Sequence, residues 1–143
     1  MSIPDSMRLP LISWIAQADY PTIQRLLLTQ RFNIAVLDGS TIVDGPSFIA
    51  QAGRDLPLDP PVLTPHWDAF PDSLYGGIIA AEIDKFALVW LAADVLLDHD
   101  PETFVNALQS FTDVAHDLCS PSEQVVVKVI LLGVGTSFKE VSL

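Results

Sequence analysis

Residues 124–135 read QVVVKVILLGVG, and this stretch decides the fold class. Apart from Gln124 and Lys128, it consists of β-branched residues, leucine and glycine, a composition that favours a strand over a helix. A strand this uniformly apolar is covered on both faces, because a solvated face would show alternating polar residues. Cover on both faces is typical of a parallel sheet whose strands are joined by helical crossovers. The stretch therefore predicts an α/β fold.

Two further apolar runs predict the remaining strands of this sheet. The run FNIAVLDG at residues 32–39 ends in Asp-Gly, which is typical of a buried strand that stops at a turn. The run FALVWL predicts a second buried strand at residues 86–91. We therefore expect a small three-stranded parallel sheet with flanking helices.

The helices follow from apolar spacing and from capping residues. Asp100 is a predicted N-cap, with Pro101 and Glu102 in the first turn of the clearest helix. A second helix starts near Pro46. The predicted buried faces of these two helices consist of Phe104, Leu108, Phe111 and Ala115, and of Phe48, Ile49 and Ala52.

The N-terminal residues predict a short two-helix preface to the main domain. The first helix is expected at residues 11–18 and the second at residues 22–30, separated by Pro21. We accordingly divide the chain into an N-terminal helical extension, residues 1–31, and a main domain, residues 32–143.

A proline-rich loop and a glycine pair frame another predicted helix. Residues 57–65 hold four prolines in nine positions, which excludes a helix there. Gly76-Gly77 is most simply a helix stop.

The charge distribution is the most informative property of the composition. The chain has a net charge of −11, with 18 acidic and 7 basic residues. Residues 32–123 alone hold 15 acidic and 2 basic residues, a net charge of −13. Direct binding to nucleic acid is disfavoured, because phosphate contacts need a basic surface. A basic protein partner is favoured, although a solvated acidic surface that only maintains solubility is the alternative.

Other features indicate a protein without a cofactor, metal or membrane segment. The apolar runs are too short or too interrupted to span a membrane, and the N-terminus is a poor signal peptide, so we expect a cytoplasmic protein. Cys119 allows no intramolecular disulfide and is expected to be partly buried. No nucleophile, base and orienting group come together, so an enzyme is not expected. We expect a monomer or a weak homodimer.

The stretch TPHWDAFPDSL, residues 64–74, places two carboxylates beside aromatic surface. Trp67 and Phe70 are three residues apart and are predicted to anchor a helix on the sheet. Asp68 and Asp72 share another face, where they are either ordinary solvated residues or a binding pair. Pro71 removes a backbone donor, so we expect the preceding turn to be irregular or tightened.

The order of elements and the segment HWDAFPDSL resemble the barstar family of ribonuclease inhibitors. That family carries Asn, Leu or Trp, Asp-Ala, Leu or Phe, an aromatic residue, Asp, Cys or Ser, and Leu in this segment. Here His66 replaces the Asn and Pro71 replaces the aromatic residue, whereas residues 67–70 and 72–74 match. The strand end VLDG at residues 36–39 and the helix segment ALQSF at residues 107–111 also fit the family.

The resemblance implies an inhibitor that blocks the active site of a basic, secreted-type ribonuclease inside the cell. Asp72 would take the place of an RNA phosphate, Asp68 would be a second acceptor for arginine, and Asp113 would add a contact at the rim. The remaining predicted contacts come from the loop and the helix start, namely Val62, Leu63, Thr64, His66 and Pro71.

The alternative is a barstar-like adaptor that binds another protein through its N-terminal helices. Its predicted surface consists of Trp14, Ile15, Leu26 and Leu27.

Overall fold

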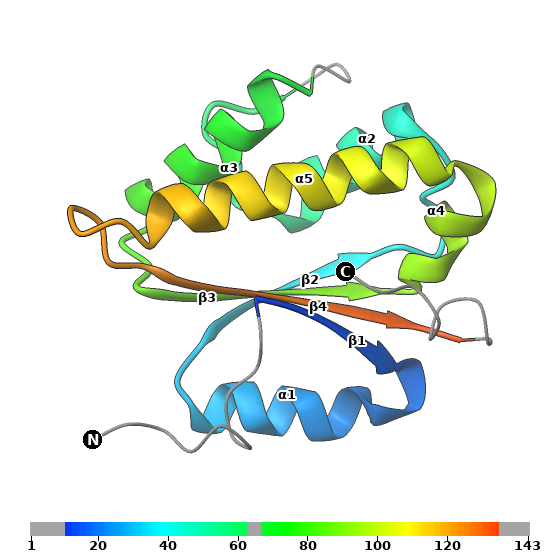
Figure 1. The fold of residues 1–143 in the computed structure, drawn as a ribbon, viewed down its shortest axis with the longest axis horizontal. Helices are drawn as coiled ribbons and strands as arrows, with labels where there is room; N and C mark the ends of the chain where they lie inside the picture. The colour runs from blue at the N-terminus through cyan, green and yellow to red at the C-terminus, as the bar shows by residue number, and fades with distance from the viewer. Residues whose placement is uncertain (1–10, 63–66, 135–143) are drawn as a thin grey trace.

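The structure of the chain is a computed structural model that describes residues 11–62 and 67–134. It contains a four-stranded sheet in the order β1-β4-β3-β2 (Figure 1). The strands are β1 (Ile12–Ala16), β2 (Asn33–Asp38), β3 (Lys85–Leu91) and β4 (Val126–Gly133), and every neighbouring pair is parallel. The predicted α/β class and parallel sheet are confirmed, whereas the predicted strand number of three is wrong.

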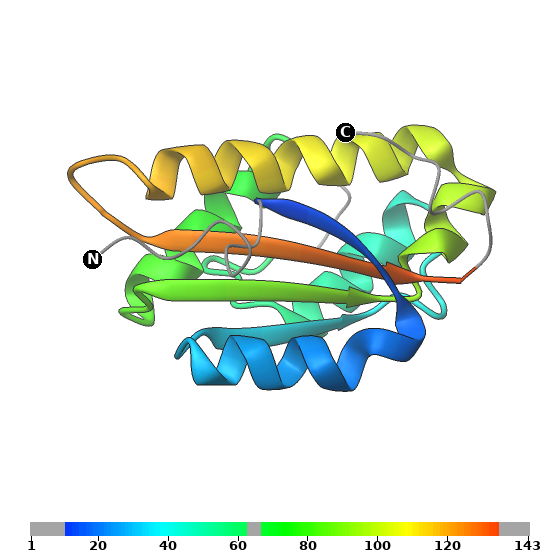
Figure 2. The ribbon, with the colours of Figure 1, turned by 60° about the horizontal axis from the view of Figure 1, so that its bottom comes forward.

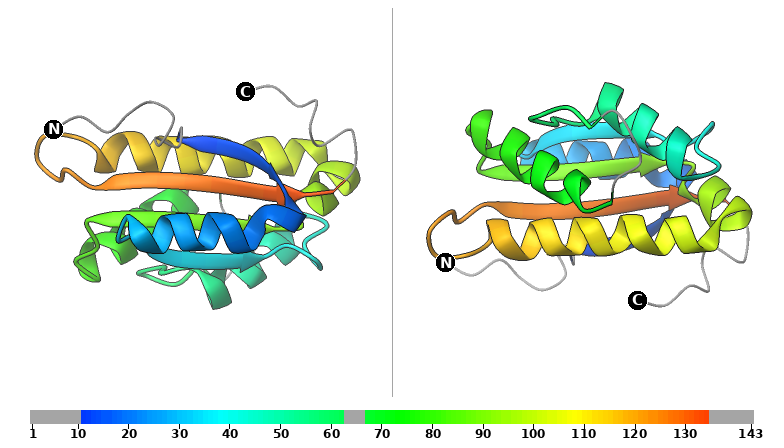
Figure 3. Two further views of the ribbon diagram at one scale, coloured as in Figure 1. Left: turned by 90° about the horizontal axis from the view of Figure 1, so that it is seen from below. Right: turned by 90° about the horizontal axis from the view of Figure 1, so that it is seen from above.

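The helices cover both faces of the sheet. On one face lies α1 (Tyr20–Thr29), which follows a short 3₁₀ helix, η2 (Gln17–Asp19). The other face is covered by α2 (Gly45–Asp55), α3 (Ala69–Ala80), α4 (Ala93–His99) and α5 (Pro101–Leu118). Figure 3 shows α1 in front of the sheet in one view and α3 and α5 in front of it in the opposite view. No helix in the described residues is long and apolar enough to cross a membrane.

The fourth strand comes from the segment predicted to be the first N-terminal helix. Instead of a helix at residues 11–18, β1 lies along β4, from Ile12 opposite Val129 to Ala16 opposite Gly133 (Figure 2). The reason is that a short apolar run fits a buried strand as well as a helix, and pairing with the edge of β4 satisfies its backbone groups. The N-terminal part of the chain is therefore not purely helical. The second predicted helix, by contrast, is confirmed as α1.

The glycine pair does not end a helix. Gly76 and Gly77 lie inside α3, which continues to Ala80. A Cβ atom at Gly77 would overlap the Pro57 carbonyl oxygen, and one at Gly76 would overlap the Asp59 carbonyl oxygen. These glycines therefore let the proline-rich loop pack directly on the helix backbone.

The predicted faces of α2 and α5 are confirmed. Asp100 is the N-cap of α5, and its carboxylate accepts a hydrogen bond from the Thr103 backbone N–H at 3.1 Å. The predicted core residues of both helices are buried, namely Phe48, Ile49, Ala52, Phe104, Leu108, Phe111 and Ala115. Cys119, by contrast, is exposed, because it follows the last residue of α5 instead of lying on the buried face.

Candidate functional site

The start of α3 explains how the chain accommodates Pro71. The helix begins at Ala69, so Pro71 lies in its first turn. Backbone N–H groups in the first turn have no partner within the helix, and a proline there removes no hydrogen bond. The residues just before the helix, Trp67 and Asp68, form a turn outside it, which agrees with the prediction that the turn preceding Pro71 is not regular helix. Asp72 also falls in the first turn, where the helix dipole favours its charge.

Aromatic side chains anchor this end of α3, as predicted. Phe70 is fully buried, and its ring packs against Phe48 and Phe111 with centroid separations of 5.3 and 6.0 Å. Trp67 is partly buried, with its ring centroid 5.4 Å from that of Phe48. Because this face of the helix start is held in the core, Asp68 and Asp72 remain exposed to solvent.

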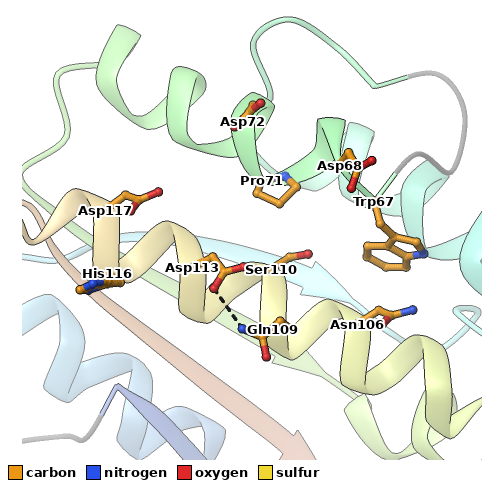
Figure 4. Close-up of a pocket in the computed structure, with 10 residues that line it drawn as sticks. All are labelled: Trp67, Asp68, Pro71, Asp72, Asn106, Gln109, Ser110, Asp113, His116 and Asp117. Carbon is orange, nitrogen blue, oxygen red and sulfur yellow. Dashed lines mark hydrogen bonds between the residues drawn. The ribbon is translucent and has the colours of Figure 1, made fainter.

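A groove with a volume of about 490 Å³ runs between the start of α3 and the middle of α5 (Figure 4). Four carboxylates line it: Asp68 and Asp72 at the start of α3, and Asp113 and Asp117 on α5. Among the described residues that line it, none is a lysine or an arginine. The other lining residues are Trp67, Pro71, Asn106, Gln109, Ser110 and His116.

The α5 side of the groove is a polar stripe with helical spacing. Its members recur three or four residues apart, which places them on one face of the helix. They are Asn106, Gln109, Ser110, Asp113, His116 and Asp117. Of these residues, the resemblance to the family predicted Asp113 alone. A search for polar periodicity beside the apolar stripe would have found the others.

The predicted site residues divide into three groups. Asp68, Pro71, Asp72 and Asp113 line one groove, although Asp113 lies far along the chain from the other three. Val62 packs in the main core with 9% of its surface exposed, so its side chain is not presented at the surface. Leu63, Thr64 and His66 lie outside the described residues, so their predicted contacts stay predictions.

The loop that precedes α3 is tied to the helix. The Asp59 backbone N–H donates a hydrogen bond to the Ser73 carbonyl oxygen at 2.9 Å, and the Ser73 hydroxyl donates to the Pro60 carbonyl oxygen. Together with the close approach at Gly77, these bonds hold the loop and the acidic end of α3 as one unit.

Hydrogen bonds orient two groups around the groove. Gln109 donates its side-chain N–H to the Asp113 carboxylate at 3.0 Å, which leaves that carboxylate able to accept further bonds. Beyond the groove, the Tyr75 hydroxyl donates to the Glu123 carboxylate at 3.1 Å. Partial burial raises the pKa of Tyr75, and the hydrogen bond to Glu123 and the charges of Glu123 and Asp117 raise it further.

The carboxylates of the groove accept hydrogen bonds and attract cations. Within residues 11–62 and 67–134, no three His, Cys, Asp or Glu side chains are placed to hold a metal ion. The arrangement therefore suits a basic ligand.

Comparisons with known proteins bear on the family of the chain. Searches of curated proteins and of solved structures found no match. A family model described as Barstar (barnase inhibitor) matches residues 32–131, which is more than two thirds of the chain and includes the whole groove. The chain therefore belongs to the barstar family of barnase inhibitors.

Proposed function

We propose that this protein inhibits a basic ribonuclease of the barnase type by covering its active site with α3 and the preceding loop. The observation that carries the proposal is the groove of four carboxylates without a lysine or arginine, on a domain of an inhibitor family. The protein would act in the cytoplasm of the cell that makes the nuclease. It would need no cofactor.

The complementarity is between carboxylates and a site built for phosphate. A ribonuclease binds the RNA backbone with cationic side chains, and a carboxylate presented in the same place accepts the same hydrogen bonds. Asp72 is our candidate for the phosphate mimic, because it is exposed in the first turn of a helix anchored by Phe70. Asp68 and Asp113 would accept further bonds from the partner's arginine side chains. Such bonds are charge-assisted and strengthen when water is excluded.

The loop before α3 would supply the remaining contacts. Leu63, Thr64 and His66 lead directly into Trp67, whose ring packs on Phe48. Val62 would support the loop from the core, because it is buried.

The net charge of −13 over residues 32–123 would speed the encounter with a basic partner. Because salt screens this long-range attraction, we expect association to slow as the ionic strength rises.

The test is inhibition of RNA cleavage by the wild-type protein and by Asp72→Ala. We expect Asp72→Ala to weaken inhibition of a barnase-type ribonuclease by at least about 100-fold, since breaking a buried charge pair costs about 3–5 kcal/mol. Its melting temperature should fall only slightly, because Asp72 is exposed and its interaction with the helix dipole is worth about 0.3–1 kcal/mol. The matched control is Asp98→Ala, which removes an exposed carboxylate from α4, outside the groove.

Equal inhibition by wild type, Asp72→Ala and Asp98→Ala would contradict the assignment of Asp72. Lack of inhibition of any barnase-type ribonuclease, especially one encoded beside this protein, would contradict the proposed function itself.

The surface suggested for an adaptor role is largely occupied by the protein's own core. Leu27 is fully buried on the side of α1 that faces the sheet, and Ile15 packs against the cluster of buried side chains that contains Leu27. Trp14 packs on the other face, with its ring 5.7 Å from that of Phe104. Leu26 alone is half-buried and lies outside both core clusters, so three of the four side chains give no support to such a partner surface.

A further inference from the structure

The edge strand β2 leaves one side of the sheet open. It is the last strand in the order β1-β4-β3-β2, so among the described strands only β3 pairs with it (Figure 3). The Gly39 N–H donates to the Leu91 carbonyl oxygen at 2.8 Å, so the odd-numbered residues of this segment direct their backbone groups toward β3. The backbone groups of Ile34 and Val36 therefore point away from the sheet. No described residue forms a hydrogen bond with them.

The chain itself closes both ends of this open edge. At one end, the Phe32 N–H donates to the Leu27 carbonyl oxygen at 3.0 Å. At the other end, the Asp38 N–H donates to the Asp55 carboxylate at 2.9 Å. Natural proteins often protect an open strand edge with a lysine or a proline, and residues 33–38 contain neither. The backbone groups between the two closed ends are therefore available to another strand.

A second copy of β2, in the antiparallel direction, matches these groups in position. If Ile34 lies opposite Val36 of the second copy, the same pair recurs on the other side of a twofold axis, and Ala35 lies opposite its own copy. Each pair exchanges two hydrogen bonds, so every outward group of Ile34 and Val36 gains a partner. Both side chains are partly buried against the cluster beneath α1, and cross-strand contacts between them would extend this cluster.

The charges at the two ends of β2 favour the antiparallel direction. The start is basic, because Arg31 is exposed and the Lys85 Nζ atom lies 4.7 Å from the centroid of the Phe32 ring. The end is acidic, because Asp38 is exposed and Asp55 lies against its backbone. Antiparallel pairing brings Asp38 of each copy opposite Phe32 of the other, beside the basic residues at the start of that strand. Parallel pairing would instead bring like charges together.

We propose that two copies of this chain associate through antiparallel pairing of their β2 strands, which joins the two sheets into one continuous sheet. Because each chain has a net charge of −11, long-range repulsion keeps this dimer weak and dependent on protein concentration. No residue of β2 lines the groove between α3 and α5, so the inference does not rest on the proposed function.

Sedimentation equilibrium of the full chain is the first test. We expect the average mass to rise from 15.6 kDa toward twice that value as the protein concentration increases. Val36→Pro should weaken association at least about tenfold, because it removes one N–H donor from each copy. The pairing of β2 with β3 should survive this change, since the Val36 N–H points away from β3.

Charge reversal tests the direction of the pairing. Asp38→Lys and Arg31→Asp each place like charges at both ends of the pair, and each should weaken association at least about threefold. Aspartate tolerates the left-handed backbone of Arg31, whose φ is 64°. An equimolar mixture of the two variants restores opposite charges at both ends and should associate like wild type. Arg25→Asp, on the exposed face of α1, is the matched control and should leave association unchanged.

A disulfide cross-link tests the register directly. Opposite residues of a pair without hydrogen bonds have Cα atoms about 4.5 Å apart, which is within the range of a disulfide. Ala35→Cys, in a Cys119→Ser background, should therefore form a covalent dimer under mild oxidation. Thr29→Cys in the same background is the control, because it places an exposed thiol on α1 and should cross-link more slowly. This measurement decides the matter if Val36→Pro does not fold.

Three results would overturn the inference. They are a mass that stays at 15.6 kDa at every concentration, a dimer that Val36→Pro does not weaken, and a mixture of the charge variants that associates no better than either variant alone. A monomer whose β2 pairs with a strand of another protein would overturn it as well. A dimer of this geometry that inhibits no barnase-type ribonuclease would support the inference and contradict the proposed function.

Discussion

The two faces of the sheet are covered by different kinds of core. Beneath α1 lies a small cluster that is aliphatic except for Phe32: Ile23, Leu27, Phe32, Ala87, Val89, Ile130 and Leu132. Beneath α2–α5 lies a larger cluster whose centre is a group of fully or almost fully buried rings: Phe48, Phe70, Trp90, Phe104 and Phe111. The acidic groove lies on the aromatic side (Figures 1 and 4).

This difference indicates that the position of the site depends on one core and not on the other. Phe111 of α5 contacts Phe70 of α3, Phe48 of α2 and Trp90 of β3, with ring centroids 6.0–6.2 Å apart. These contacts hold α3 and α5 at a fixed distance, and the groove is the space between them. The α1 face contributes to stability without touching either wall of the groove.

The largest effect is expected from Phe111→Ala. Loss of a buried phenylalanine should lower the free energy of unfolding by about 3–5 kcal/mol. Because the ring supports Phe70 from the opposite helix, inhibition by the remaining folded protein should also weaken. Urea unfolding and nuclease titration measure the two effects. If Phe111→Ala unfolded at the same urea concentration as wild type, the central role of the Phe111 ring would be contradicted.

The next largest effect tests the other face. Leu27→Ala on α1 removes a fully buried side chain and should cost about 2–3 kcal/mol of stability. Inhibition should remain unchanged under conditions where the variant is folded, because Leu27 packs on the face opposite the groove. A matching loss of inhibition would show that the two faces are not independent, and the comparison would fail.

A smaller effect is expected where the loop meets α3. Gly77→Ala introduces a methyl group against the Pro57 carbonyl oxygen, so the loop must move away from the helix. We expect a net loss of about 1–2 kcal/mol, since overpacking outweighs the better helix propensity of alanine. Gly53→Ala is the matched control, because a Cβ atom at Gly53 of α2 would meet nothing within 4 Å. A Gly77 variant as stable as the Gly53 variant would contradict the close approach.

The smallest effect on stability is expected at acidic pH. Hydrogen bonds from the Ser47 hydroxyl and backbone N–H to the Asp44 carboxylate lower the pKa of Asp44 below its ordinary value of 3.8. The folded state therefore binds this proton less readily than the unfolded state. The resulting stability is present above pH 3.8 and is lost as the pH falls through the folded pKa.

Asp44→Asn tests this contribution, because asparagine caps a helix equally well and does not titrate. Wild type should lose stability slightly more steeply than the variant below pH 3.8, in thermal melts at low salt. Parallel stability curves for the two proteins in acid would contradict the prediction.

Much of the fold followed from local patterns. The strands β2, β3 and β4 are apolar runs that end at turn residues. The sequence of α5 begins with an N-cap residue, which is followed by apolar residues at helical spacing. The segment around Asp68 and Asp72 was found because a like-charged pair beside two aromatic residues is unusual in one short stretch. These features are readable because a helix or strand of ordinary length carries its own periodicity.

Other features depend on what lies nearby in space. The short apolar run at β1 is compatible with a helix or a strand. It forms a strand because it pairs with the open edge of β4. From the sequence, Gly76 and Gly77 resembled a helix stop. In the structure these two positions are glycine because the loop packs so closely on the helix that a Cβ atom would overlap it.

By itself, then, the sequence determined the α/β class, most of the elements, the family resemblance and the concentration of negative charge in residues 32–123. The tertiary structure alone decided that Asp68 and Asp72 line the same groove as Asp113 and Asp117, with Pro71 between the two helices. The physical reason is that a groove is a property of two surfaces. Periodicity along each helix predicts its own face, whereas the distance and orientation between α3 and α5 depend on the packing of Phe70, Phe111 and their neighbours.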